Sequence, residues 1–228
     1  MNYNGITIEG RMLLAENRFN NSKFFYDENK ERLKQLTTVP LRQLAGEMCD
    51  ILDGIDPFIV TDPVKMVSRI RRDTRFSKDK TLYRENLWIM FMRSKHTWEH
   101  QPCMWFEMHP DRYTYGIGMF RTTPEYMRQF RALLNETPDE FLRCAQKCAD
   151  VGAHAEIEPY KKKFNNCEDE RVEPFYNAKY LCFMRTSCEV DRLEDGRIVD
   201  ELKSALQAFA PMYKFLLTIT ERMTALGL

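Results

Sequence analysis

Apolar residues in the first quarter of the chain recur at the spacing of helices. Ser22 is placed to cap a helix that runs through Leu36, and Pro40 suits the first turn of a second helix. One apolar face of that second helix is formed by Leu41, Leu44, Ala45, Met48, Ile51 and Leu52. Gly54 and Pro57 then end it. The sequence therefore predicts a helical beginning.

The centre of the chain has the pattern of strands. Residues 87–92 form a continuous apolar run, and residues 103–108 are short, aromatic and bounded by prolines. Residues 113–119 alternate large side chains with Thr or Gly, which is typical of a half-buried strand. Between the last two segments, residues 109–112 (His-Pro-Asp-Arg) favour a turn. We expect an antiparallel hairpin here.

Two helices with clear starts follow this hairpin. Thr123 precedes Pro124, and Thr137 with Glu140 has the spacing of a capping box. In the second of these helices a core-facing stripe is predicted for Phe141, Cys144, Ala145 and Cys148.

The last third of the chain combines strands with a helical end. Residues 153–157 and 181–190 are strand candidates, and residues 161–173 form a charged loop between them. Asp200 is expected to cap C-terminal helices over residues 200–226, which Pro211 should break or kink. We predict an α+β fold in which helices pack on a central, mainly antiparallel sheet, as a single domain over residues 1–228.

Composition narrows the setting of this fold. Lys plus Arg and Asp plus Glu are 34 each, so no global field attracts nucleic acid or an anionic membrane. The apolar run over residues 87–92 is far too short to span a bilayer. The chain has seven cysteines, which is an odd number, and no C-x-x-C motif. Its first residues have neither the basic region nor the apolar run of a secretory signal. We therefore expect a cytoplasmic protein with reduced thiols and no membrane contact.

One stretch, residues 65–84, differs from the rest, and we call it the basic loop. It contains two acids, Asp73 and Asp79, against eight basic residues, so this stretch carries a local excess of six positive charges in a neutral chain. The basic residues are Lys65, Arg69, Arg71, Arg72, Arg75, Lys78, Lys80 and Arg84. The planar guanidinium group of arginine binds phosphate or carboxylate through two parallel hydrogen bonds. We expect a long, well-tied loop that leads into the strand at Leu87.

The basic loop has three interpretations. As an anion site it would bind a ligand through Arg69, Arg72, Arg75, Lys78, Lys80, Tyr83 and Arg84. As a structural network, Asp73 and Asp79 would lock the basic side chains across the loop. As a solvated charged face it would do neither. A glycine-rich phosphate loop is excluded because the stretch has no glycine.

The run SRIRRDTRFSKDKT over residues 68–81, followed by Tyr83-Arg84, resembles the core motif of a bacterial and fungal family, domain of unknown function 2461. Phe24-Phe25 and Gly116-Ile117-Gly118 resemble its flanking parts, so the likeness spans about residues 20–131. Leu82 stands where a proline is expected. The resemblance implies one domain and no established activity.

Other constellations favour packing over chemistry. Gly116 and Gly118 share one side of their strand, which relieves packing or admits a ligand or a backbone. His96 and His100, with His109 at the turn, have no complementary Cys or Asp that would complete a metal site. Cys144 and Cys148 fall on an apolar helix face. We expect no metal and no cofactor.

Three functional possibilities stay open from the sequence. The first is a module that binds a small anionic ligand through the basic loop, and an open basic groove there would extend this class to nucleic acid. The second is an enzyme acting on a phosphorylated or carboxylated small molecule, with Asp73, Asp79 or Tyr83 moving a proton. A structural loop in a scaffold for a partner chain is the third possibility. The sequence does not define the oligomeric state.

Overall fold

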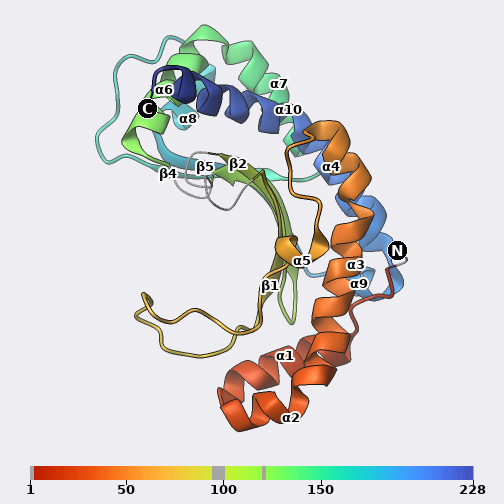
Figure 1. Cartoon of the computed structure of the whole chain (residues 1–228). Coiled ribbons are helices and arrows are strands. Elements are labelled where there is room, and N and C mark those ends of the chain that lie inside the picture. The colour runs from red at the N-terminus through yellow and green to blue at the C-terminus, as the bar shows by residue number, and fades with distance from the viewer. Residues whose placement is uncertain (1–2, 94–100, 120–121, 228) are drawn as a thin grey trace. The chain divides into compact units, whose positions relative to one another are not determined.

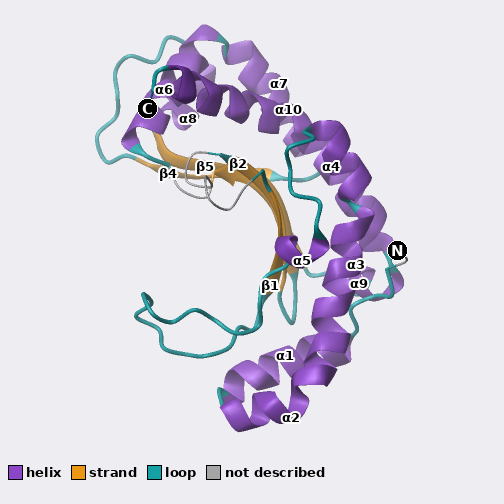
Figure 2. Ribbon diagram, in the orientation of Figure 1, coloured by secondary structure: helices purple, strands orange, loops and turns teal. Residues whose placement is uncertain are grey.

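The protein, as a computed structural model, is described over residues 3–93, 101–119 and 122–227 and has an α+β fold (Figures 1 and 2). Its strands form one five-stranded antiparallel sheet in the order β1-β2-β3-β5-β4. The predicted fold class is therefore confirmed. The strands are β1 (Leu87–Phe91), β2 (Pro102–Met108), β3 (Tyr113–Met119), β4 (His154–Pro159) and β5 (Ala178–Ser187). The helical segments are α1 (Ile8–Asn20), α2 (Lys23–Leu33), the π-helical η1 (Lys34–Thr38), α3 (Val39–Glu47), α4 (Cys49–Ile55), α5 (Pro63–Met66), α6 (Pro124–Glu136), α7 (Pro138–Asp150), the 3₁₀ turn η3 (Glu170–Val172), α8 (Glu173–Tyr176), α9 (Arg192–Asp195) and α10 (Arg197–Ala225).

The chain forms two compact units. The first comprises Met1–Phe91, Trp105–Tyr115 and Thr186–Lys203, and the second comprises Met92–Met104, Gly116–Arg185 and Ser204–Leu228. A single domain over the whole chain stays a prediction.

The helices of the first unit begin largely where their capping residues predict. Ser22 caps α2 by accepting a hydrogen bond from the Phe25 N–H, and Pro40 lies in the first turn of α3. The predicted apolar face is buried at Leu41, Leu44, Ala45, Met48 and Leu52. Helix α1, which Thr7 caps, is an addition to the predicted elements.

The predicted hairpin is present. Strands β2 and β3 are neighbours in the sheet, and the His109 N–H donates to the Arg112 carbonyl at 2.8 Å. The prediction that β3 is half-buried is wrong, because all seven of its residues are buried. As the central strand, β3 has β2 on one edge and β5 on the other, and both of its faces are covered.

Within the first unit the two faces of the sheet differ. Leu87, Ile89 and Phe91 of β1 are fully buried, whereas the alternate residues Trp88 and Met90 are half-buried. Helices α3 and α5 contact β1. At β1 the sheet therefore has one fully buried apolar face, and the opposite face carries the half-buried side chains.

In the second unit an aromatic core joins four helices and strand β5, where the Phe183 ring lies 6.4 Å from the Phe141 ring. The Phe141 ring of α7 lies 5.9 Å from Phe130 of α6, 4.8 Å from Phe175 of α8 and 5.5 Å from Phe215 of α10. Cys144 and Cys148 are buried on the same face of α7, as predicted. Strand β4 pairs with β5 in an antiparallel register in which His154 faces Met184.

Of the three predicted capping residues Thr123, Thr137 and Asp200, one caps its helix and two do not. Thr123 caps α6 as predicted, by accepting from the Tyr126 N–H. The Thr137 side chain caps nothing, because its hydroxyl donates to the Leu133 carbonyl at 3.0 Å. Asp200 does not cap α10 either. That helix begins at Arg197, where Asp195 accepts from the Arg197 N–H at 3.0 Å, and it continues through Pro211 without a break.

No described helix is long and apolar enough to cross a bilayer. All seven cysteines are free thiols, and Cys188 is exposed. Gly118 of β3 has a simple explanation, because a Cβ atom there would lie 2.5 Å from the Cys182 Cβ and 2.8 Å from the Leu181 carbonyl oxygen. The close approach that the sequence suggested is thus made by the neighbouring strand β5.

Candidate anion-binding site

The basic loop closes on itself through a short β-paired stem (Figure 1, yellow, between α5 and β1). Arg71 and Tyr83 form an antiparallel bridge. On either side of it, the Arg72 N–H donates to the Leu82 carbonyl at 2.8 Å and the Arg84 N–H donates to the Ile70 carbonyl at 3.0 Å. We call residues 70–72 and 82–84 the stem. The predicted well-tied loop beside the sheet is confirmed.

The α1–α2 hairpin holds this stem in place. Asn21, which ends α1 in a left-handed conformation with φ of 47°, accepts a hydrogen bond from the Leu82 N–H at 2.7 Å. The Tyr26 ring of α2 stacks on the Tyr83 ring at 4.7 Å. Arg18 pairs with Asp79 at 3.7 Å. The motif residues Asp79 and Tyr83 therefore fix the loop to the helices.

The Arg72 side chain crosses the loop and bonds to residues on its other side, and we call this set of contacts the latch. Its guanidinium donates to Asp79 and to the Thr81 hydroxyl, and it lies 3.5 Å from the Ser77 hydroxyl. The backbone N–H of Thr81, and then Arg72, hold the pKa of Asp79 far below its usual range. Only 19% of the Arg72 side chain is exposed. At Arg72 the geometry matches the structural-network interpretation.

Arg75 and Lys80 are also engaged within the loop, but at its surface. Arg75 forms a two-point pair with Asp73, with Nε to Oδ1 at 3.0 Å and Nη2 to Oδ2 at 2.7 Å, and its side chain is 77% exposed. The Lys80 ammonium donates to the Thr74 carbonyl at 2.9 Å. Arg69 and Lys78 are exposed, and the described part of the chain gives neither of them a hydrogen bond or an ion pair.

The seven candidate residues do not form a single cluster. In a paired stem, alternate residues point to opposite faces. Arg72 and Arg84 share one face, whereas Tyr83 lies on the other face and packs against Tyr26. The structure therefore separates Tyr83 from Arg84, although the two are adjacent in sequence.

Arg84 differs from the other arginines of the loop. Its guanidinium carbon lies 4.3 Å from the centroid of the Trp88 ring, in a cation–π contact. Its Nε is buried and has no hydrogen-bond partner among the residues that the structure describes. Within residues 3–93, 101–119 and 122–227, no carboxylate accepts a hydrogen bond from this guanidinium. Burial lowers the pKa of Arg84 and the nearby charge of Arg72 lowers it further, while Glu107 acts in the opposite direction.

Next to Arg84, a second polar group occupies the same face of the sheet. The Asn86 amide donates to Glu107 Oε1, and the His109 Nε2 lies 3.5 Å from the same oxygen. The other ring nitrogen of His109 is 3.5 Å from Arg112 Nη2. The bond from His109 is the main cause that lowers the pKa of Glu107.

Asn86 and Glu107 are not among the site residues predicted from the sequence. A usable signal was present, since Arg84, Asn86 and Trp88 alternate along one extended segment. His96 and His100 lie outside the described residues, whereas both ring nitrogens of His109 face protein groups. Among the side chains that the structure describes, no three of His, Cys, Asp or Glu gather as a metal site would require.

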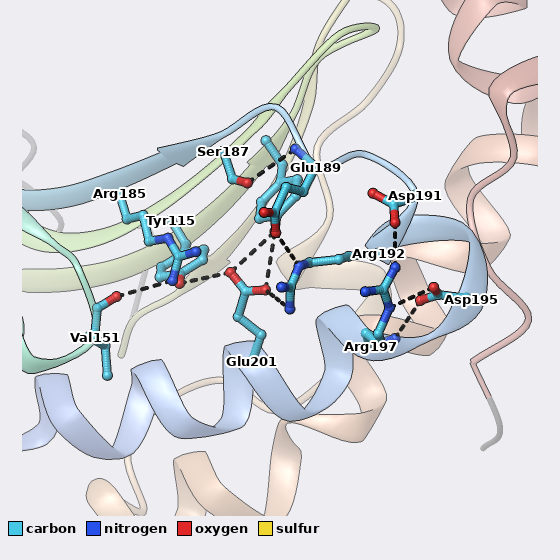
Figure 3. Close-up of polar contacts among 11 residues, drawn as sticks. Tyr115, Val151, Arg185, Ser187, Glu189, Asp191, Arg192, Asp195, Arg197 and Glu201 are labelled. Atoms are coloured by element: carbon cyan, nitrogen blue, oxygen red, sulfur yellow. Dashed lines mark hydrogen bonds and ion pairs between the residues drawn. The ribbon is translucent and has the colours of Figure 1, made fainter.

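A separate polar cluster in the first unit has a structural role (Figure 3). Glu201 of α10 is only 10% exposed and accepts hydrogen bonds from Tyr115 at 3.0 Å and Tyr113 at 3.1 Å. Arg192 completes the cluster at 3.2 Å from the Glu201 carboxylate. Each of these groups bonds to another group of the cluster. The cluster therefore holds the start of α10 against β3, and we assign it no role in ligand binding.

The fold and this geometry define an α+β protein whose antiparallel sheet carries a β-paired basic loop. The chain belongs to the family described as conserved hypothetical protein, domain of unknown function 2461, whose model matches residues 12–215. The match extends past both ends of the resemblance seen in the sequence. No curated protein matches the chain. The family's description assigns it no activity.

Proposed function

We propose that this protein binds a small ligand bearing a phosphate or carboxylate group at the Arg84 face of the basic loop. The observation that carries the proposal is the Arg84 guanidinium, which lies on Trp88 with its Nε unpartnered and the Arg72 charge nearby. A half-buried cation without a carboxylate partner is costly, and a bound anion would relieve that cost.

The charge balance of the loop supports the same function. Asp73 already faces Arg75 and Asp79 already faces Arg72. Neither acid is left to neutralise Arg69, Arg71, Lys78 or Arg84. A local positive field therefore persists on a neutral molecule and would raise the concentration of anions near the loop.

The positioning of Arg84 suits recognition. Its backbone is paired with Ile70, and its guanidinium is seated on the ring of a strand residue. The Arg72 latch and the contacts with α1–α2 order the loop in advance of any ligand. Such preorganisation reduces the entropy that binding must overcome.

An enzyme that uses the loop acids or Tyr83 for proton transfer has less support. Hydrogen bonds from Arg75 lower the pKa of Asp73 to about 2, and the pKa of Asp79 is lowered further still. Burial raises the pKa of Tyr83, which faces away from Arg84. A proton-transfer group works best with a pKa near the working pH, and none of the three has one.

The cytoplasm remains the compartment we propose. The support is the set of seven free thiols, since an exposed thiol such as Cys188 persists in a reducing environment. Thiol titration of the natively purified protein, after denaturation without reductant, should count seven free groups. A count of five or fewer would reveal a disulfide and oppose this location.

The experiment is thermal unfolding of the wild type and of two matched variants, with and without millimolar phosphate, citrate or nucleotide. An anion at ~100 times its dissociation constant should stabilise the wild type by roughly 2.7 kcal/mol. Arg84→Gln should fold and lose this effect. Arg75→Gln removes an equal charge from the exposed pair with Asp73 and should keep most of it. The proposal fails if no anion shifts the wild-type midpoint, or if Arg84→Gln responds like the wild type.

A further inference from the structure

Two tryptophans lie on the sheet face beside Arg84. The Asn86–Glu107 hydrogen bond aligns β1 with β2, which are antiparallel neighbours, so residues 86 and 107 share a face. Trp88 lies two residues beyond Asn86 and Trp105 lies two residues before Glu107, so the two indoles are on that same face of neighbouring antiparallel strands.

These indoles are not part of the apolar core. Trp88 and Trp105 are both half-buried, whereas the intervening residues Leu87, Ile89 and Phe106 are fully buried on the opposite face. The Trp88 and Trp105 indoles therefore leave aromatic surface partly open on the face that carries the Arg84 guanidinium. The combination has the composition of a binding site, a flat apolar floor with a few polar groups at its edge.

From this placement we propose that the ligand carries a planar aromatic ring next to its anionic group, with the ring on the Trp105–Trp88 floor and the anion at Arg84. This inference rests on the proposed anion-binding function and specifies its ligand class. Because Arg84 already contacts the Trp88 ring, the ligand ring stacks on Trp105. The Asn86 amide and the Glu107 carboxylate border the floor, where the amide can donate a hydrogen bond to the ring edge and the carboxylate can accept one.

The ring and the anion can be separated with paired probes. Adenosine 5′-monophosphate and ribose 5-phosphate share a phosphate and differ in the aromatic base, and benzoate and acetate form the matching carboxylate pair. Stacking of one ring on an aromatic side chain should make the aromatic member of the recognised pair bind about tenfold tighter. The pair that shows this gain also identifies the anion as phosphate or carboxylate.

The test is isothermal titration calorimetry of all four probes with the wild type, Trp105→Leu and Trp105→Phe. Trp105→Leu keeps apolar volume without a ring and should lose the tenfold preference, while Trp105→Phe keeps a ring and should retain most of it. Quenching of the intrinsic fluorescence by the adenine probe is a second readout, since the chain has only three tryptophans and Trp88 and Trp105 are two of them.

The possible failures are distinguishable. Equal affinities within each pair, with Arg84-dependent binding of the anions, would overturn the aromatic ligand class and leave anion binding standing. A preference that survives in Trp105→Leu would place the ring elsewhere and overturn the assignment to Trp105. Binding of none of the four probes, together with no stabilisation by any anion in the melting experiment, would overturn the proposed function and this inference with it.

Discussion

At the scale of single residues, Arg72 and Arg84 have different surroundings although both belong to one motif. They lie on the same face of the stem, two residues from each other across the pairing. The Arg72 guanidinium bonds to Asp79, Thr81 and Ser77, whereas that of Arg84 lies on the Trp88 ring and donates to no carboxylate of the described residues. The same residue type is thus neutralised in one place and left available in the other.

This difference predicts opposite effects on stability. Arg72→Ala removes the donor that satisfies Asp79 and Thr81, so the melting temperature should fall by about 2–6 °C. The exposed pair between Arg75 and Asp73 is screened by water, so Arg75→Ala should leave the melting temperature essentially unchanged. Scanning calorimetry of both variants provides the comparison. Equal midpoints for the two variants would contradict the role of Arg72 as a latch.

Glu107 predicts part of the acid sensitivity. Its pKa in the folded protein is lowered, mainly by the hydrogen bond from His109, relative to about 4.3 in an unfolded chain. The ionised form therefore stabilises the fold above about pH 4.3, and this contribution is lost as the pH falls through the lower folded pKa.

Urea unfolding between pH 6 and pH 3 measures this dependence. Glu107→Gln cannot ionise, so its free energy of unfolding should decline less steeply than that of the wild type as the pH falls below about 4.3. The two curves should converge at the acid end. Parallel curves over the whole range would show that Glu107 contributes nothing to the acid response.

At the scale of elements, what could be predicted from the sequence depended on local signals. Strand β3 and the starts of α2 and α6 were found because alternation, Ser22 and Thr123 act within a few residues. Helix α1 was overlooked because Ile8, Met12 and Phe19 are exposed and blur its apolar period. The stem could not be seen in advance, since its pairing depends on Asn21 and other groups far away in sequence.

The prediction of the site residues was limited in the same way, because it lacked the contacts between residues that are distant in sequence. Counting charges located the basic loop, yet it could not separate Arg72 from Arg84, because their difference lies in Asp79 on one side and Trp88 on the other. Tyr83 was grouped with the anion ligands although it packs on Tyr26. The pairing of Asn86 with Glu107 required the register between β1 and β2, which no local signal contains.

The approach of β3 to β5 gives a prediction for the sheet. In Gly118→Ala the new methyl group would meet Cys182 and the Leu181 carbonyl, so the strands must move apart, at a cost of roughly 1–3 kcal/mol in the free energy of unfolding. Gly54→Ala is the matched control, because Gly54 lies in α4 with nothing within 4 Å of an added Cβ. That substitution should be neutral or stabilising by up to ~1 kcal/mol.

Denaturant unfolding of the two glycine variants decides this point. A Gly118→Ala protein as stable as the Gly54→Ala control would mean that the strands are farther apart than the structure has them.

At the scale of the whole molecule, balanced charge confines the proposed anion attraction to the basic loop. Lys plus Arg and Asp plus Glu are 34 each, so the field of the basic loop is not reinforced by the rest of the chain. Binding should therefore weaken as salt shortens the screening length from about 10 Å at 0.1 M to about 3 Å at 1 M. A neutral molecule of this kind favours small ligands over long polyanions, which require an extended positive surface.

The central claim is that Arg84, rather than the loop as a whole, holds the anion. It is tested most directly by a crystal structure of the protein soaked in selenate, whose selenium is located by anomalous scattering. The account predicts a peak with selenate oxygens about 2.7–3.1 Å from the Arg84 guanidinium nitrogens, beside Trp88. Well-ordered density for Arg84 without such a peak, or selenate bound only at exposed residues such as Arg75 or Arg69, would contradict it.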